Sequence, residues 1–399
     1  MNIFNKLYCR TFQLAFKLAL PLLPYKQPEI LQSVDEVPSV LKKDNIDKAF
    51  IVTDGGVMKC GLVDGLTAAL SAAGIDYSIY DKTMPNPTIA AVEEAREQYV
   101  AANCGAIIAV GGGSPMDLAK AVGARIARPK KSLKDMAGIM HVRKKLPLLI
   151  AVPTTAGTGS ETTLAAVITD GETHRKFAIN DFPLIPRYAV LDYRLTLGLP
   201  NAVTAYTGMD ALTHAVEAFI GRSTTKDTRA KSIEAVKLVH DNLMTAYDNP
   251  TDEDARRNML YAAHYAGIAF TKSYVGYVHA IAHSLSGKYG LAHGLTCTVL
   301  LPVVLESYGK AAHKKLAILA REIGVAEQSD SKAVAAEKFI AWVYSMNDYF
   351  GIPRGFAEIK DEDIDGMSAF AAKEGNPLYP VPKLFSRKQL KQLYYKVKL

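Results

Sequence analysis

Short apolar runs alternate with amphipathic stretches between about residue 48 and residue 200. The apolar runs are KAFIVTD (48–54), GAIIAVGGGS (105–114), LPLLIAVPTT (146–155) and YAVLDY (188–193). Stretches with apolar residues at helical spacing, such as TIAAVEEAREQYVAAN, separate them. Continuous apolar strands that alternate with helices predict a mostly parallel, doubly wound sheet. Such a sheet binds ligands beyond the carboxyl ends of its strands.

Beyond about residue 200 the pattern becomes helical. Apolar residues recur at intervals of three and four in AVTAYTGMDALTHAVEAFI, TRAKSIEAVKLVHDNLMTAY, EDARRNMLYAAHYAGIAF and SKAVAAEKFIAWVYSMNDYF. No convincing strand pattern occurs in this half. We therefore predict an α/β domain over residues 25–200 and an all-α domain over residues 201–399.

The first 24 residues, MNIFNKLYCRTFQLAFKLALPLLP, are predicted to form an amphipathic extension. Apolar residues lie near helical spacing, but Lys6, Arg10 and Lys17 interrupt them. A transmembrane helix needs about 20 apolar residues, and a secretory signal needs an apolar core before a small-x-small site. Neither pattern is present. We expect a helix docked on the protein or on a partner subunit; the alternative is an interfacial membrane anchor with a basic face.

The composition is typical of a soluble globular protein. The 399 residues are 49% hydrophobic and 22% charged, with a net charge of +7. The basic clusters at residues 128–134 and 141–145 lack interleaved aromatics, so we interpret them as solvated faces and predict no nucleic-acid partner. The four cysteines are scattered and form no C-x-x-C pair. Reduced thiols and a cytoplasmic location are therefore expected.

A glycine-rich turn follows the second apolar run, in AVGGGSPMDLAK. The glycines allow a tight turn and the close approach of a ligand. Ser114 is expected to be the N-cap of a helix, Pro115 its first residue, and Asp117 part of a capping box. The free N–H groups at such a helix start can bind a pyrophosphate. Met116 breaks the G-x-G-x-x-G pattern, so a purely structural turn is the alternative.

Two further features favour a nucleotide cofactor. The loop PTTAGTGSETT (153–163), rich in hydroxyls and glycines, follows the third run, so two such loops are expected at neighbouring strand ends. Asp54 ends the first run, where a carboxylate can accept hydrogen bonds from ribose hydroxyls and would repel a 2′-phosphate. NAD is thus favoured over NADP. The alternative for Asp54 is a turn-forming aspartate before two glycines.

Five residues of the helical half are candidate metal ligands. Asp210 and His214 are four residues apart, as are His279 and His283, so each pair shares one face of a helix. His293 follows two glycines and reaches the others only if the chain folds back. Spacing alone leaves open which of the last three histidines is not a ligand. A carboxylate with imidazoles and no thiolate suits Fe(II), Zn(II), Mn(II), Co(II) or Ni(II).

Four motifs together resemble those of the iron-containing (group III) alcohol dehydrogenase family. They are GGGSPMD, PTTAGTGSE, GMDALTHAVEA and GYVHAIAHSLSGKYGLAHG. The resemblance runs from about residue 28 to the C-terminus. It implies a dehydroquinate synthase-like architecture, with the active site between an N-terminal nucleotide-binding domain and a C-terminal helical domain. It also implies a homo-oligomer, either a dimer or a larger assembly.

The resemblance further implies roles for individual residues. The implied metal ligands are Asp210, His214, His279 and His293. His283 is implied to stand beside the metal as the catalytic residue, and Phe270 to border the substrate pocket. The implied NAD-binding residues, with Asp117 of the glycine-rich turn grouped among them, are Asp54, Gly111, Gly112, Gly113, Ser114, Asp117, Thr154, Thr155, Thr163 and Lys176. Ser284 stands where family members often have proline, and TKSYVG (271–276) is bulkier than usual.

The expected reaction is hydride transfer between NAD(H) and a primary alcohol or aldehyde. A divalent metal, Fe(2+) or else Zn(2+) or another ion, would polarise the substrate oxygen, and His283 would relay the proton to solvent. The alternative role for His283 is packing beside the metal. Alternative functions are an NAD-using lyase or cyclase of the dehydroquinate synthase type, a zinc-dependent glycerol or diol dehydrogenase, and a non-catalytic scaffold recruited by the N-terminal helix. The sequence does not identify the alcohol.

Overall fold

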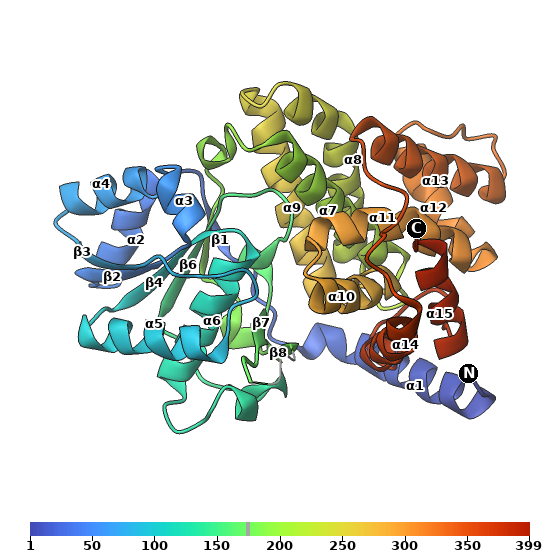
Figure 1. The fold of residues 1–399 in the computed structure, drawn as a ribbon. Helices are drawn as coiled ribbons and strands as arrows, with labels where there is room; N and C mark the ends of the chain where they lie inside the picture. The colour runs from blue at the N-terminus through green and yellow to red at the C-terminus, as the bar shows by residue number, and fades with distance from the viewer. Residues whose placement is uncertain (173–175) are drawn as a thin grey trace. The chain divides into compact units, whose positions relative to one another are not determined.

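The computed structural model describes residues 1–172 and 176–399 (Figure 1). The chain forms two compact units. The helical unit comprises Met1–Leu23, Pro200–Pro250 and Tyr261–Leu399, and the α/β unit comprises Pro24–Leu199 and Thr251–Leu260. Helix α9 (Glu253–Ser273) contributes residues to both. The α/β unit is therefore not one continuous stretch of sequence.

A six-stranded sheet forms the centre of the α/β unit. Its order is β1-β9-β6-β4-β2-β3, and all its pairings are parallel. The strands are β1 (Glu29–Leu31), β2 (Lys48–Val52), β3 (Asp76–Tyr80), β4 (Ala106–Gly111), β6 (Leu148–Pro153) and β9 (Tyr188–Val190). The four predicted runs are β2, β4, β6 and β9, which confirms the predicted parallel sheet. Every residue of β4 is buried, as expected for a central strand covered on both faces.

Helices cover both faces of this sheet (Figure 1). On one face lie α2 (Val37–Lys43), α3 (Gly55–Lys59) and α4 (Asp64–Ala72), and on the other lie α5 (Ile89–Ala101) and α6 (Gly113–Ala127). Each face of the sheet packs against its helices in a separate hydrophobic core. Successive residues of β2 point into opposite cores, because side chains alternate along a strand. Phe50 packs in the core beneath α5 and α6, whereas Ile51 packs in the core beneath α2 and α4. The predicted doubly wound arrangement is therefore confirmed.

Five strands were not predicted. β1 and β3 are the edges of the large sheet, and a smaller sheet has the order β5-β8-β7. Its strands are β5 (Gly138–Ile139), β7 (Ala165–Thr169) and β8 (Lys176–Asn180), with β7 antiparallel to β8. β3, DYSIY, is exposed at its first two positions, so it lacks the continuous apolar run that marks the buried strands. Edge strands carry this weaker pattern because one side and part of a face remain in water.

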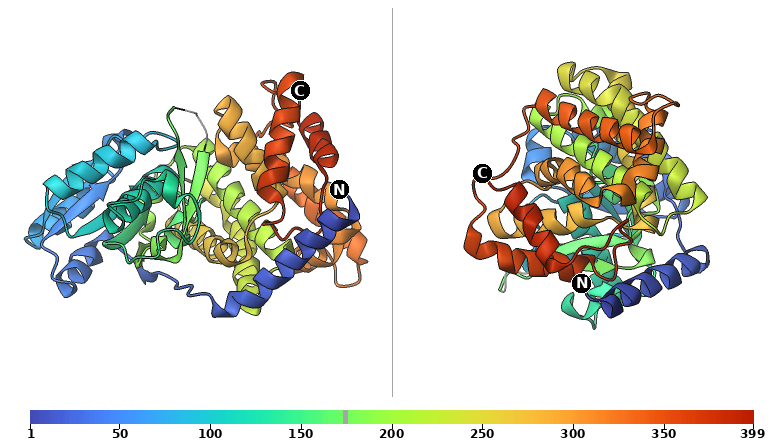
Figure 2. Two further views of the ribbon diagram at one scale, coloured as in Figure 1. Left: turned by 90° about the horizontal axis from the view of Figure 1, so that it is seen from below. Right: turned by 90° about the vertical axis from the view of Figure 1, so that its right-hand side faces the viewer.

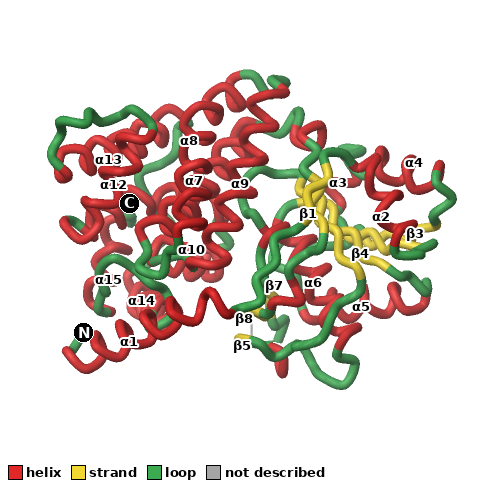
Figure 3. The backbone as a smooth tube through the Cα atoms, turned by 180° about the vertical axis from the view of Figure 1, so that it is seen from behind, coloured by secondary structure: helices red, strands yellow, loops and turns green. Residues whose placement is uncertain are grey.

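The helical unit consists almost entirely of helices (Figure 3). Besides part of α9, they are α1 (Ile3–Ala19), α7 (Asn201–Ile220), α8 (Lys226–Asp248), α10 (Tyr277–Tyr289), α11 (His293–Tyr308), α12 (Lys310–Glu322), α13 (Lys332–Tyr349), α14 (Asp361–Gly375) and α15 (Arg387–Lys396). Short 3-10 helices in the chain are η1 (Leu20–Leu22), η2 (Val34–Glu36), η3 (Lys134–Met136), η4 (Ser160–Thr162), η5 (Phe182–Leu184) and η6 (Tyr193–Thr196). The four helices predicted beyond residue 200 are α7, α8, α9 and α13, so the all-helical prediction is confirmed.

Helix α1 lies against other helices of the helical unit (Figure 2), with Cys9 and Gln13 buried and the Phe16 ring in edge contact with Tyr274. The Arg10 guanidinium donates to the carbonyl oxygens of Val381 and Pro382 at 2.8 and 3.0 Å, and the Gln13 amide donates to that of Tyr379 at 2.8 Å. Other large apolar side chains of this helix are exposed, among them Ile3, Phe4, Leu7, Leu14 and Leu18. Among the described residues, no helix is long and apolar enough to cross a membrane.

Candidate metal centre and cofactor loops

Three helices of the helical unit bring the candidate ligands together. Asp210 and His214 lie on α7, His279 and His283 on α10, and His293 is the first residue of α11. Helix α10 ends at Gly290, whose φ of 69° is in the left-handed region that favours glycine. The chain turns back there, and α11 packs beside both α10 and α7. This turn is the fold-back that the position of His293 required.

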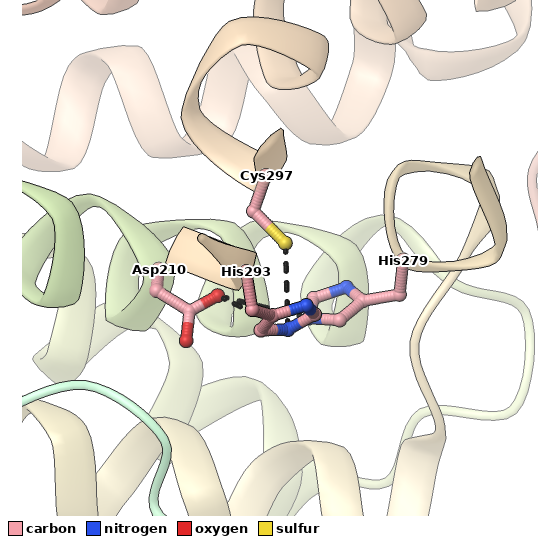
Figure 4. A group of neighbouring side chains, drawn as sticks. All are labelled: Asp210, His279, His293 and Cys297. Atoms are coloured by element: carbon pink, nitrogen blue, oxygen red, sulfur yellow. Dashed lines mark hydrogen bonds and ion pairs between the residues drawn. The ribbon is translucent and has the colours of Figure 1, made fainter. Parts of the chain in front are cut away.

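The Asp210 carboxylate points toward the imidazoles of His293 and His279 (Figure 4). Its Oδ1 atom is 3.9 Å from Nε2 of His279 and 3.8 Å from Nε2 of His293. These distances are too long for hydrogen bonds. They resemble the separation of two ligands on one ion, because metal–N and metal–O bonds of about 2.0–2.2 Å place ligand atoms roughly 3–4 Å apart. Asp210 Oδ2 is also 3.9 Å from Nδ1 of His214.

Asp210 Oδ1 and His279 Nε2 are buried without a hydrogen-bond partner among the described residues. Asp210 and His279 are each 2% exposed, and no described residue hydrogen-bonds to Asp210 Oδ1 or His279 Nε2. Burial raises the pKa of Asp210 to about 7 and lowers that of His279 to about 3. His279 is therefore neutral at physiological pH, the form that binds metals. A divalent cation would satisfy both atoms, so this donor set fits a metal ion.

Glu217, which the sequence analysis missed, supports His279 from behind. This α7 carboxylate lies 2.7 Å from His279 Nδ1 and accepts the main-chain N–H groups of Gly276 and Val278 at 2.8 and 2.9 Å. A proton held on Nδ1 leaves Nε2 turned toward Asp210, and such a carboxylate commonly orients a metal-binding histidine. Its position seven residues after Asp210, on the same helix face, could have identified it.

Two aromatic rings extend the cluster on the side of His214. The His214 imidazole stacks on His279, with ring centroids 4.4 Å apart, and on Phe270 of α9, with centroids 4.2 Å apart. The structure therefore brings the predicted pocket residue Phe270 to the predicted ligand His214. Stacking on both faces fixes the plane of the His214 ring.

His283 stands at the edge of the cluster and faces a different carboxylate. Its Nδ1 atom is 2.6 Å from Oε1 of Glu374, which also accepts the Tyr379 hydroxyl at 2.7 Å. Burial alone would raise the pKa of Glu374, but the charge and hydrogen bond of His283 outweigh it and lower that pKa. The His283 side chain is 37% exposed and stacks on His293, with ring centroids 5.3 Å apart. His283 thus adjoins the candidate ligands while remaining accessible to water.

A thiol also belongs to the cluster, whereas the sequence analysis assumed none. Cys297 lies one helical turn after His293, with its Sγ atom 3.6 Å from His293 Nε2 (Figure 4). One ligand atom from each of Asp210, His279, His293 and Cys297 lies within 4.8 Å of the others. The signal in the sequence is the spacing of four residues between His293 and Cys297, which places both side chains on one helix face.

In the α/β unit the two candidate cofactor loops adjoin each other. Gly111 has a φ of +146°, which favours glycine, and a Cβ at this position would lie 2.7 Å from Pro115 Cγ. The Thr154 N–H donates to the Gly111 carbonyl at 3.1 Å, and a Cβ on Gly112 would lie 3.4 Å from Thr155 Oγ1. The glycine-rich turn and the threonine-rich loop therefore form one surface at the ends of β4 and β6.

The predicted cap of the helix that follows is wrong. Helix α6 begins at Gly113, after an N-cap residue that makes no side-chain hydrogen bond. Ser114 is thus inside the first turn, Pro115 is not the first helical residue, and the Asp117 carboxylate accepts a main-chain N–H of β7 at 3.2 Å instead of closing a capping box. The positive φ of Gly111 starts the helix earlier. The first-turn N–H groups therefore have no side-chain cap.

Lys120, in the same motif, is a buried lysine that the sequence analysis did not single out. Its ammonium donates to the carbonyl oxygens of Ser160 and Ala165 at 2.7 and 3.0 Å and to Thr163 Oγ1 at 2.7 Å. The predicted cofactor residue Thr163 is thus engaged by Lys120. Burial lowers the pKa of Lys120 to about 8, although two nearby carboxylates oppose the shift.

The remaining cofactor candidates lie at strand ends. Asp54 follows β2 and caps α3, its Oδ1 accepting the N–H groups of Gly56 and Val57 at 2.8 and 2.9 Å. The turn-forming role is therefore present, and Oδ2 makes no hydrogen bond to a described residue. Lys176 begins β8 and donates to Asn86 Oδ1 at 2.7 Å.

Lys120 makes the stability of the α/β unit depend on pH. Between pH 8 and 10.5 the folded chain releases a proton that the unfolded chain still binds, since the pKa of this ammonium falls from its ordinary 10.5 to about 8. The free energy of unfolding should therefore rise by about 1.4 kcal/mol per pH unit in this range. Denaturation followed by circular dichroism from pH 7 to 10 should show this rise in the native chain and a flatter profile in Lys120→Met. Parallel profiles would contradict the assignment.

Both halves of the chain are similar to known proteins. Residues 31–193 match the family described as "Iron-containing alcohol dehydrogenase", and residues 204–397 match "Fe-containing alcohol dehydrogenase family, C-terminal". The NAD-dependent methanol dehydrogenase of Bacillus methanolicus is 38% identical over 344 residues, which cover 86% of this chain and 90% of that protein. The 1,3-propanediol dehydrogenase of Klebsiella pneumoniae is 40% identical over 333 residues, which cover 82% of this chain and 86% of that protein.

The fold agrees with these matches. A crystal structure of a 1,3-propanediol oxidoreductase superimposes with a TM-score of 0.90 at 35% identity, over 94% of this chain and 99% of that one. Together, the two family matches and the similar relatives show that the chain belongs to the iron-containing alcohol dehydrogenase family and is an oxidoreductase that acts on alcohols.

Proposed function

We propose that this enzyme transfers hydride between NAD(H) and a short primary alcohol or its aldehyde, with a divalent metal, iron foremost, held by Asp210, His279 and His293. The observation that carries the proposal is the convergence of these side chains, with Asp210 Oδ1 and His279 Nε2 buried and without partners among the described residues. When bound, the metal would supply Lewis-acid polarisation of the substrate oxygen. The relatives named for methanol and 1,3-propanediol support this substrate class.

His214 and Phe270 complete the proposed site. We assign His214 as a further ligand because it adjoins the Asp210 carboxylate. Phe270 holds the His214 ring by stacking on it, and an apolar side chain there would suit the carbon chain of a small alcohol. The role of Glu217 is to keep His279 in the tautomer whose Nε2 is available.

NAD is the proposed cofactor, bound by the residues that the sequence indicated. The adjoining glycine and threonine loops offer uncapped N–H groups at the start of α6, where a pyrophosphate can accept hydrogen bonds. The Asp54 carboxylate at the end of β2 would accept from ribose hydroxyls and repel a 2′-phosphate. The enzyme is therefore expected to prefer NADH over NADPH.

His283 is proposed as the group that exchanges the substrate proton with water. It contacts Glu374 on one side and solvent on the other, as a proton relay requires. Replacing His283 with alanine should leave the metal content unchanged and lower kcat by about 100-fold, since a positioned acid–base group contributes at least that much. Metal analysis and turnover on one sample check this. A variant that turns over normally would reduce His283 to a packing role.

The proposed function is tested by oxidation of NADH with a series of aldehydes under anaerobic conditions. Short unbranched aldehydes should give stoichiometric alcohol, in a sample whose metal content is measured at the same time. An NAD-using lyase or cyclase would instead show no net consumption of NADH. Absence of NADH oxidation by metal-loaded enzyme with every aldehyde would overturn the proposal. The rate of NADH oxidation is then compared between a zinc-loaded and an iron-loaded sample. The metal that gives the higher rate distinguishes the iron enzyme from the zinc diol dehydrogenase.

We further propose a cytoplasmic homo-oligomer, a dimer in its simplest form. The four cysteines are all free thiols, which suits a reducing compartment. The exposed apolar row of α1 supports an assembly that covers it, because large apolar patches are rare on monomers. Sedimentation of the full chain, compared with a chain lacking residues 1–24, measures both the oligomeric state and the contribution of α1.

A further inference from the structure

Cys297 is placed as a metal ligand would be. His293 and Cys297 are four residues apart on α11, so both side chains project from one face of the helix. The distance between Sγ and His293 Nε2 is 3.6 Å. Two ligands of one tetrahedral ion, with metal–S and metal–N bonds of about 2.3 and 2.1 Å, would be roughly 3.6 Å apart.

A second observation points to the same position independently of the thiol. Asp210 Oδ1 and His279 Nε2 are buried and have no hydrogen-bond partner among the described residues. They come from α7 and α10, whereas Cys297 comes from α11, so three helices direct polar atoms at one point. One ligand atom from each of Asp210, His279, His293 and Cys297 lies within 4.8 Å of the others. The sulfur is therefore one of the donor atoms gathered at the proposed metal site, in addition to those of the ligands assigned above.

We propose that Cys297 binds the metal as a thiolate in the substrate-free enzyme, alongside Asp210, His279 and His293. Binding forms a sulfur–metal bond and breaks the S–H bond, and the proton passes to solvent. A thiolate makes the donor set softer, which favours zinc and cobalt over manganese or magnesium. The inference rests on the proposed metal site but adds a ligand to it.

The surroundings explain why the thiol would ionise only with a cation present. Cys297 is fully buried, and burial together with the neighbouring Asp210 and Glu217 carboxylates raises the pKa of its thiol well above the ordinary value. A divalent ion beside the sulfur reverses this, because a metal-bound thiol is deprotonated.

Cobalt(II) provides the test, because a thiolate ligand gives cobalt a charge-transfer absorption band in the near ultraviolet. The metal-free full chain is loaded anaerobically with one equivalent of cobalt(II), and its spectrum is recorded without substrate. We expect the band in the native protein and its loss in Cys297→Ser. The matched control is a chain in which Cys9, Cys60 and Cys104 are all serine, which should keep the band even if Cys297→Ser fails to fold.

The outcomes separate the two proposals. Stoichiometric cobalt binding without the band overturns the role of Cys297 and leaves the proposed metal site intact. A band that disappears in the triple-serine control also overturns it, because the sulfur would then come from another cysteine. Failure of the native chain to bind cobalt overturns both the thiolate ligand and the proposed metal site.

Discussion

Replacing His279 with alanine should empty the metal centre and lower kcat/KM by about 10³-fold or more. Polarisation of a substrate oxygen by a metal is worth several kcal/mol, and each factor of ten in rate corresponds to about 1.4 kcal/mol. His279 is a buried ligand whose Nε2 has no hydrogen-bond partner among the described residues, so its loss removes a ligand from the buried part of the site. The His279 ring also separates Glu217 from Asp210.

The measurement combines metal analysis after dialysis with NADH oxidation on the same sample. His240→Ala is the matched control, because His240 lies on α8 and pairs with Asp241 at the surface of the same unit. We expect His240→Ala to keep both metal and activity. If His279→Ala retains stoichiometric metal, this histidine is not a ligand and the proposed site is wrong.

Local spacing predicted the parts of this site that lie on single helices. Asp210 with His214, and His279 with His283, were paired because residues four apart share a helix face. The position of His293 could not be derived in this way, since it depends on the turn at Gly290 and on how α11 packs against α7. Glu374 was not found at all, because it reaches His283 across 91 residues of sequence. Long-range contacts of this kind leave no periodic signal.

In the sheet, too, the elements with a clear local sequence pattern were predictable, and those that depend on tertiary contacts were not. β4 was predictable because burial on both faces demands a continuous apolar sequence. β3 and the strands of the small sheet could not be predicted, because their half-exposed residues resemble loop sequences. The misplaced cap of α6 has a related cause. Ser114, Pro115 and Asp117 have the residue types of a capping box, but the conformation of Gly111 decided where the helix began.

Among the residues that contact no substrate, Glu217 is the one whose replacement should lower the free energy of unfolding most. Glu217→Ala leaves the N–H groups of Gly276 and Val278 and Nδ1 of His279 without their acceptor. A buried donor left unsatisfied costs about 1–3 kcal/mol, so the free energy of unfolding should fall by about 3 kcal/mol or more. The fluorescence of Trp342, the only tryptophan, reports on the helical unit during denaturation of the metal-free chain.

Glu217→Gln separates this stabilising role from the role in metal binding. The amide oxygen can still accept one of the two main-chain N–H groups, so stability should fall less than in Glu217→Ala, by about 1–3 kcal/mol for the other N–H. Loss of the negative charge, however, frees the His279 ring to change tautomer, and metal affinity should fall by about 10- to 100-fold. Glu322→Gln, which removes a half-exposed carboxylate paired with Lys237, should change neither quantity appreciably. Native metal affinity in Glu217→Gln would mean that the Asp210, His279 and His293 geometry is set by helix packing alone, without help from the carboxylate behind it.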